Sequence, residues 1–117
     1  MKNNWFTNKG DEWSYRRGNV QAFADRDSSD LVFSIRGASV KGKSLTQKQL
    51  LRLLQDSNRL FPELNIEIKL TKAERQLMNR IRELQLKGSI ETQSKESDSN
   101  LVFSLSSVKE RNWWLLW

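Results

Sequence analysis

Residues 67–69 form an E-x-K triplet whose residue types could support metal-assisted hydrolysis of a phosphodiester. In that chemistry carboxylates hold Mg²⁺ while a lysine steadies the attacking water. The site needs a further carboxylate from a neighbouring strand, but the nearest acids, Asp56 and Glu63, are expected on a helix and in a loop. Alternating charge on the solvent side of a strand therefore explains Glu67 and Lys69 better than a hydrolytic site does.

Residues 25–30 have the sequence DRDSSD, which places oxygen ligands at the first, third and fifth positions of a calcium loop. Such a loop also needs Gly at its sixth position and a bidentate Glu at its twelfth. The sequence has Asp30 and Arg36 at those positions. We interpret the segment as a solvated hairpin tip and expect no metal site.

The chain contains neither His nor Cys. It therefore lacks the ligands of an ordinary zinc site, the imidazole of a Ser–His or Cys–His nucleophile pair, and the thiols of a disulfide. Catalysis would fall to carboxylates, Lys, Ser or Tyr, which makes most enzyme classes poor candidates. We expect a protein that binds without catalysing a reaction and without a cofactor. Because no secretory or membrane-spanning run is present, the expected compartment is the cytoplasm.

The 117-residue chain has a formal net charge of +6, and this excess is concentrated in its centre. Residues 36–87 contain twelve basic and five acidic residues, a net of +7, whereas the remainder is close to neutral. A local excess of this kind is the electrostatic signature of a phosphate-binding face. A solvated basic surface without a ligand would give the same composition, and the sequence leaves both readings open.

The basic segment begins with the stretch 37–44 (GASVKGKS), which we interpret as a loop. Its glycines lack the spacing of a Walker phosphate-binding loop. Its two lysines, Lys41 and Lys43, remain candidates for contacts with phosphate.

Two helices are predicted in the same segment. An S-x-x-Q capping box at Ser44 predicts a helix that ends near residue 60, and a T-x-x-E box at Thr71 predicts a second over 72–87, with Gly88 as its C′ residue. Each helix has an apolar stripe for the core and an opposite polar stripe that is mostly basic. The polar stripes consist of Lys48, Arg52, Gln55 and Arg59 on the first helix, and of Arg75, Asn79 and Arg82, flanked by Lys72, Arg80 and Lys87, on the second.

Alternating apolar and polar residues predict strands around these helices. The first predicted hairpin consists of 12–24, with Gly18 as a possible bend, and 31–35, around the tip 25–30. A further strand is predicted at 65–70. The second hairpin consists of 89–94 and 101–108, around the tip 95–100. The segments 28–41 and 97–109 resemble each other in sequence. A duplicated hairpin and a chance match are both compatible with that likeness.

The segment 71–106 resembles the recognition helix and wing of winged-helix DNA-binding domains. A capped helix with a basic outer face is followed by K-G-x-I and then by a hairpin with a charged tip. The resemblance implies that the helix lies in the major groove and that the hairpin contacts the neighbouring backbone. It would direct Arg75, Asn79 and Arg82 to bases or phosphates, and Lys95 to the backbone. The sequence departs from that family because the strand 65–70 leads directly into Thr71, where a short helix and a tight turn are usual.

The tail ends in NWWLLW and places Trp113, Trp114 and Trp117 within a few residues of one another. These rings could pack back onto the sheet, dock into a partner or a second copy of the chain, or anchor at a membrane interface. We expect no membrane span. The second alternative would make the chain a homodimer or a protein-interaction adaptor.

We therefore predict a single α+β domain over 1–117, in which two helices pack on antiparallel β-hairpins and the second half is winged-helix-like. Its parts are an N-terminal hairpin with a basic loop (1–43), a helix–strand–helix–hairpin unit (44–108) and the Trp-rich tail (109–117). The predicted function is non-enzymatic nucleic-acid binding, with DNA favoured over RNA, by a small regulator or a mobile-element accessory factor. The alternative is an adaptor that uses the tail.

Overall fold

A computed structural model describes residues 5–27, 31–71, 74–96 and 100–108, with backbone alone for residues 27, 92–96, 100–101 and 103–108. The elements follow one another along the chain as β1 (Phe6–Lys9), β2 (Glu12–Arg17), β3 (Val20–Asp27), β4 (Val32–Val40), α1 (Gln47–Leu60), β5 (Asn65–Thr71), α2 (Arg75–Leu86), β6 (Ile90–Glu96) and β7 (Asn100–Val108). The described chain is thus an α+β fold, as the sequence predicts. Neither described helix is long and apolar enough to cross a membrane.

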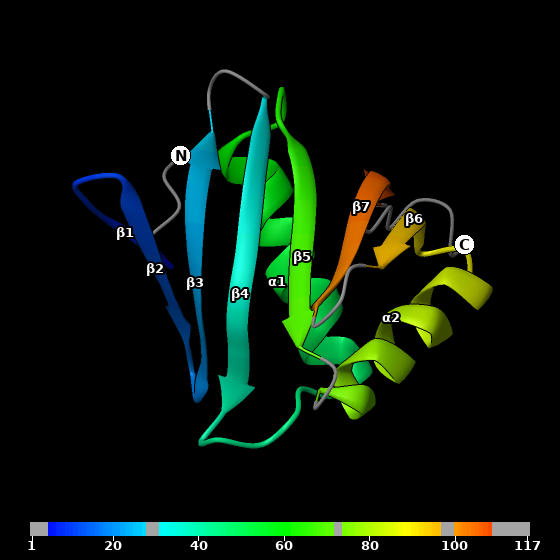
Figure 1. The fold of residues 1–117 in the computed structure, drawn as a ribbon. Coiled ribbons are helices and arrows are strands. Elements are labelled where there is room, and N and C mark those ends of the chain that lie inside the picture. The colour runs from blue at the N-terminus through cyan, green and yellow to red at the C-terminus, as the bar shows by residue number, and fades with distance from the viewer. Residues whose placement is uncertain (1–4, 28–30, 72–73, 97–99, 109–117) are drawn as a thin grey trace, which may run out of the picture.

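The described strands form one seven-stranded mixed sheet in the order β1-β2-β3-β4-β5-β7-β6 (Figure 1). β4 and β5 are parallel and are joined through α1, whereas every other neighbouring pair is antiparallel. β6 follows α2 but lies at the edge, because β7 inserts between β5 and β6. The hairpin expected as a wing is therefore the edge of the main sheet.

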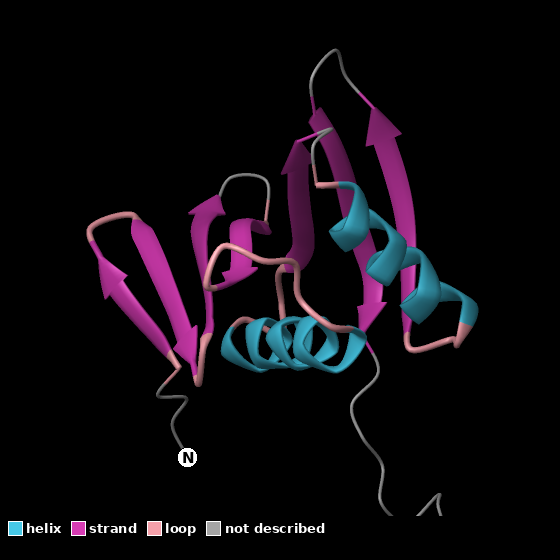
Figure 2. Ribbon diagram, turned by 90° about the horizontal axis from the view of Figure 1, so that it is seen from below, coloured by secondary structure: helices cyan, strands magenta, loops and turns pink. Residues whose placement is uncertain are grey.

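Both helices cover the same face of the sheet. Alternate residues of β5, Ile66, Ile68 and Leu70, are at most 2% exposed and join the buried residues of both helices in one hydrophobic cluster. α1 lies behind β3, β4 and β5 in Figure 1, and Figure 2 shows it running across one side of the strands. Neither of the two described helices lies on the opposite face of the sheet. The fold therefore has a helix-bearing face and an open sheet face.

α1 begins at Gln47, later than the capping box at Ser44 predicts. The box that forms lies two residues further on: Gln49 N–H donates to Thr46 Oγ1 over 3.2 Å, and Thr46 N–H donates to Gln49 Oε1 over 2.9 Å. Leu45 before this cap and Leu50 in the first turn are both buried, in the positions of a hydrophobic staple. Burial of Leu45 fixes the start of the helix, which a capping pattern read alone misplaces.

α2 begins at Arg75 and not at residue 72, because Thr71 still belongs to β5. One of the two hydrogen bonds of the predicted capping box is present, because the Glu74 carboxylate accepts from Thr71 N–H over 2.9 Å. The end of the helix is as predicted: Gly88 has φ +77°, Gly88 N–H donates to Gln85 O, and Ser89 N–H donates to Leu84 O. These two bonds form a Schellman motif.

The N-terminal strands differ from the prediction in three places. The possible bend at Gly18 is a complete reversal of the chain, with φ +62°, so that residues 12–24 form two strands, β2 and β3, which pair with each other. β1 was not predicted. β4 continues to Val40 through an irregularity at Gly37, with φ +65°, so the expected loop 37–44 shortens to a tight turn at 41–42. The hairpin of β6 and β7 agrees with the prediction within two residues.

Candidate nucleic-acid interface

The outer side of α1 carries the basic stripe that the sequence predicts. Lys48, Arg52 and Arg59 are exposed, on the side of the helix opposite its buried leucines. Arg59 lies 3.6 Å from a carboxylate oxygen of Asp56, whereas Lys48 and Arg52 make no ion pair with any described residue. Two cations on this stripe therefore have no described acidic partner.

The outer ridge of α2 consists of Arg75, Asn79 and Arg82, which are all exposed. Within the described part of the chain, neither arginine has an ion-pair partner. Lys87 extends the exposed basic surface just beyond the helix end. The spacing that predicts a common face is thus realised.

Arg80 has a different environment from its neighbours on α2. Its Nη1 lies 3.1 Å from Glu83 Oε1, and the same oxygen accepts from Gln47 Nε2 over 2.8 Å. The bond from Gln47 and then the one from Arg80 hold the pKa of Glu83 below its usual range. Arg80 therefore takes part in the contact between the two helices and is a weaker candidate for phosphate than the outer ridge.

A groove of about 620 Å³ lies between the end of β4 with the turn that follows it and the start of α2. It is lined by Ala38, Ser39, Gly42, Lys43, Ser44, Glu74, Arg75, Gln76 and Leu77. Lys43 comes from the predicted basic loop and Arg75 from the second helix, so the fold brings two predicted site residues together. Lys41 is exposed in the adjoining turn, which is closed by hydrogen bonds of 2.8 and 2.9 Å between Val40 and Lys43.

Ser44 adds a polar atom to this groove. Its Oγ is buried and has no hydrogen-bond partner among the described residues. Because this oxygen is shielded from solvent, the exposed Lys43 and Arg75 are the better candidates for binding an anion in the groove. Glu74 is the acidic residue of the lining and limits the net charge of the groove.

A buried carboxylate on α1 was missed by the sequence reasoning. Asp56 is 1% exposed and accepts from Tyr15 Oη over 2.6 Å and from Arg17 Nη1 over 2.9 and 3.1 Å. Burial, and then the bond to Asp56, raises the pKa of Tyr15. Arg17 and Arg52 line the same small hollow of about 180 Å³. The signal in the sequence was an acid next to the apolar stripe of α1, although its partners on β2 could not be named.

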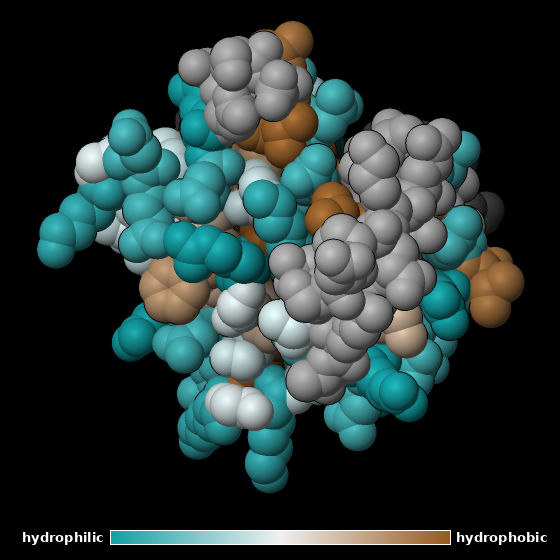
Figure 3. Space-filling model, in the orientation of Figure 1, coloured by the Kyte–Doolittle hydropathy of each residue, from teal (hydrophilic) through white to brown (hydrophobic). Residues whose placement is uncertain are grey.

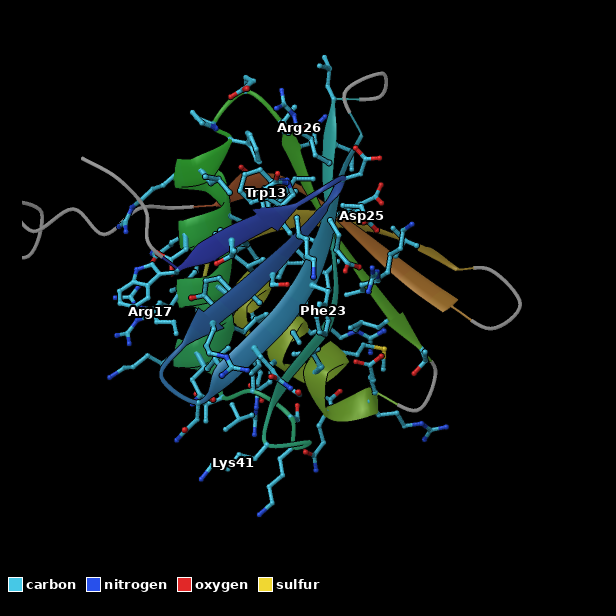
Figure 4. All side chains as sticks on the ribbon, turned by 90° about the vertical axis from the view of Figure 1, so that its left-hand side faces the viewer. Trp13, Arg17, Phe23, Asp25, Arg26 and Lys41 are labelled. Carbon is cyan, nitrogen blue, oxygen red and sulfur yellow. The ribbon has the colours of Figure 1, made fainter. Side chains whose placement is uncertain are left out.

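The open sheet face holds acids and bases in comparable numbers. Arg36 pairs with Glu12 and lies 3.5 Å from Asp25, and these contacts raise its pKa. Figure 4 shows Phe23 and Asp25 on the side of the sheet away from α1. The part of this side that is not covered by grey atoms in Figure 3 is largely hydrophilic. Its charges balance in number and pair at close range around Arg36, which is typical of a solvated sheet surface.

Glu67 and Lys69 lie on this open face, at alternate positions of β5. Glu67 is in register with Ser34, whose hydroxyl donates to it over 3.4 Å, and Ser34 is in register with Asp25 on the next strand. Asp25 and Glu67 are thus separated by a whole strand. Within the described ranges, no group of three or more carboxylates could hold a metal ion.

Several predicted site residues lie outside the described part of the chain. They are Lys72, the side chain of Lys95, and the tryptophans Trp113, Trp114 and Trp117. The alternatives for the tail therefore stay predictions. The expected position of Lys95 at the hairpin tip is wrong, because its backbone lies within β6 and pairs with Val102.

Comparison with known proteins finds no matching family model, no matching curated protein and no matching solved structure. The winged-helix resemblance of residues 71–106 thus stays a prediction.

Proposed function

We propose that this protein binds nucleic acid, without catalysing a reaction, through its helix-bearing face. The observation that carries the proposal is the difference in charge between the two faces. The two helices carry six basic residues against two acidic ones, Asp56 and Glu83, whereas on the open face Arg16, Arg36 and Lys69 stand with Glu12, Asp25 and Glu67. Unpaired cations spread over two helices suit an extended polyanion better than a compact anionic ligand.

The groove supports the same proposal at the level of a single contact. Lys43 and Arg75 both line the groove and are exposed, so they supply two cations that could bind a phosphate there. From there the outer ridge of α2 continues through Asn79 to Arg82. DNA is the favoured nucleic acid because of the winged-helix resemblance, and under that proposal this ridge would contact bases or backbone.

Salt dependence of affinity is the direct test. We would measure fluorescence anisotropy of a labelled 20-base-pair duplex and of its single strands at about 50 and 150 mM salt. If about four phosphates are neutralised, the log–log slope is near −0.9 per phosphate on duplex DNA, so binding weakens about 50-fold across this range. Affinity that is independent of salt, or no binding at low salt, would contradict the proposal.

Two double variants provide a matched control for the face. K48A/R52A removes one lysine and one arginine from the helix side, and R16A/K69A removes the same two residue types from exposed positions on the open face. Both lower the net charge equally, so a non-specific charge effect would weaken binding equally. We expect K48A/R52A to bind more weakly and its log–log salt slope to become shallower by the contribution of about two phosphate contacts. We expect R16A/K69A to bind nearly as tightly as wild type.

A further inference from the structure

A second hollow, of about 400 Å³, lies at the other end of α1 from the groove. It is lined by Asn8, Gly10, Asp11, Trp13 and Arg26, from β1, β2, β3 and the turn that joins the first two strands. Its volume falls within the roughly 300–1,000 Å³ of ordinary ligand pockets. In Figure 4 Trp13 and Arg26 lie at one end of the sheet, and Lys41 marks the opposite end.

Trp13 is held in this hollow by other aromatic rings. Phe6, Phe33 and Phe61 meet it edge-to-face, with ring centroids 5.4–6.5 Å apart. Trp13 is nevertheless only partly buried, so part of its indole surface borders the hollow. A fixed, partly exposed aromatic surface suits stacking by a planar ring.

Arg26 and Asp11 supply polar groups beside that surface. The Arg26 guanidinium lies 4.6 Å from the centroid of Phe61, and this stacking positions it while its N–H groups can still bind an anion. Asp11 is exposed at the β1–β2 turn and makes no ion pair with any described residue. Its carboxylate can only accept hydrogen bonds, so it selects a ring edge that donates them.

The basic stripe of α1 leads from the groove to this hollow. Lys48 lies near the start of the helix, next to the turn that forms the groove, and Arg59 lies near its end, two residues before Phe61. The helix has 14 residues and is therefore about 21 Å long. That length matches a few nucleotides of a single strand.

We infer that the Trp13 hollow binds one unpaired nucleobase, stacked on the indole, in a strand whose backbone follows α1. Guanine fits best, because its Watson–Crick edge presents two adjacent N–H donors to the Asp11 carboxylate, and Arg26 binds the phosphate of the same nucleotide. A paired base inside a duplex cannot enter, so the hollow selects single-stranded or locally opened nucleic acid. The inference deepens the proposed function, on which it rests for the polymer.

Mononucleotides test the hollow without the polymer. In a ¹H–¹⁵N spectrum the Trp13 indole N–H is assigned from its loss in W13F, and the protein is titrated with guanosine monophosphate, adenosine monophosphate and ribose 5-phosphate. We expect a saturable shift of that signal with the guanine nucleotide, a smaller one with the adenine nucleotide and none with the sugar phosphate. D11N should abolish the preference for guanine. The control E91Q removes an exposed acid on β6, at the opposite edge of the sheet from β1, and should not change it.

The polymer test uses two oligothymidine strands of twelve residues, one with a single central guanine and one with an abasic site in its place, each made as DNA and as RNA. We expect the guanine strand to bind about fivefold or more tightly than the abasic one, the low end of base–aromatic stacking, and W13L to remove that difference. A Trp13 signal that does not move, together with equal binding of both strands, overturns the inference while salt-dependent binding still supports the proposed function. A guanine-induced shift without any strand binding keeps the hollow and overturns the proposed function.

Discussion

Replacing Tyr15 by phenylalanine removes one hydrogen bond and leaves the rest of the Asp56 environment in place. Tyr15 is 2% exposed, and its hydroxyl donates to Asp56 over 2.6 Å. Bonds to a charged acceptor contribute about 1.5–3 kcal/mol, and we expect Y15F to lower the free energy of unfolding by that amount. Arg17 still neutralises the carboxylate, so the larger cost of an unpaired buried charge does not arise.

The expected loss converts into a measurable melting shift. Unfolding entropy is about 2.1 cal/mol/K per residue, or about 0.25 kcal/mol/K for this chain, so the loss corresponds to about 6–12 °C in Tm. Differential scanning calorimetry of Y15F and wild type measures it. A shift below about 2 °C would show that Asp56 finds another donor and that the bond adds little to stability.

The same variant gives a pH test whose sign follows from the raised pKa of Tyr15. A group whose pKa is raised on folding makes its full contribution to the stability of the folded state at any pH below its pKa in the unfolded chain, which is about 10 for tyrosine. That contribution is lost as the pH rises towards the pKa of the group in the folded protein. The stability gap between wild type and Y15F should therefore be constant up to about pH 9 and shrink above pH 10. Urea unfolding of both proteins from pH 7 to 11 measures the gap, and a gap that widens at high pH would refute the account.

Two further predictions concern the reading surface and the irregularity in β4. R82A should weaken binding to a preferred DNA sequence by about 1–3 kcal/mol if Arg82 contacts a base bidentately. R52A should weaken binding less and should affect all sequences alike. Equal and negligible losses of affinity in the two variants on one target would refute the assignment of the α2 ridge as the surface that reads DNA sequence. G37A should destabilise the fold by about 1–2 kcal/mol or more, because a left-handed φ is strained for alanine and the added Cβ would lie 3.3 Å from Phe23. Gly18 also has a positive φ, but a Cβ added there would have nothing within 4 Å. Thermal melts of G18A and G37A therefore separate the effect of the Phe23 contact from that of backbone strain. Equal losses of stability in the two variants would show that the Phe23 contact contributes nothing.

Local signals predict the parts of this fold whose causes are local. Gly88 ends α2 because a left-handed residue is needed there, and that need is visible in the sequence. The start of α1 depends partly on where Leu45 is buried, which a capping pattern does not contain. β7 inserts between β5 and β6 through pairs such as Ile68 with Phe103, and no short-range pattern encodes such a distant partner.

The candidate site shows the same division between local and distant causes. Helical spacing predicts that Arg75, Asn79 and Arg82 share an exposed face, and they do. The groove joins Arg75 to Lys43 only because β5 returns the chain next to the end of β4. The hollow at Trp13 needs Phe61 and Arg26 to meet across three separate elements, so composition and spacing gave no sign of it.

The order of elements explains why the basic excess of residues 36–87 becomes one surface. Both connections that contain helices run in the same direction along the sheet, and crossovers of the usual right hand then place α1 and α2 on the same face. Basic residues on the helices consequently collect there, while Arg36 and Lys69, which belong to strands, alternate onto the open face beside Glu12, Asp25 and Glu67. Since the open face balances its own charges, the net positive field of the described chain must extend from the helix side, and a polyanion approaching the molecule would be drawn to that side first.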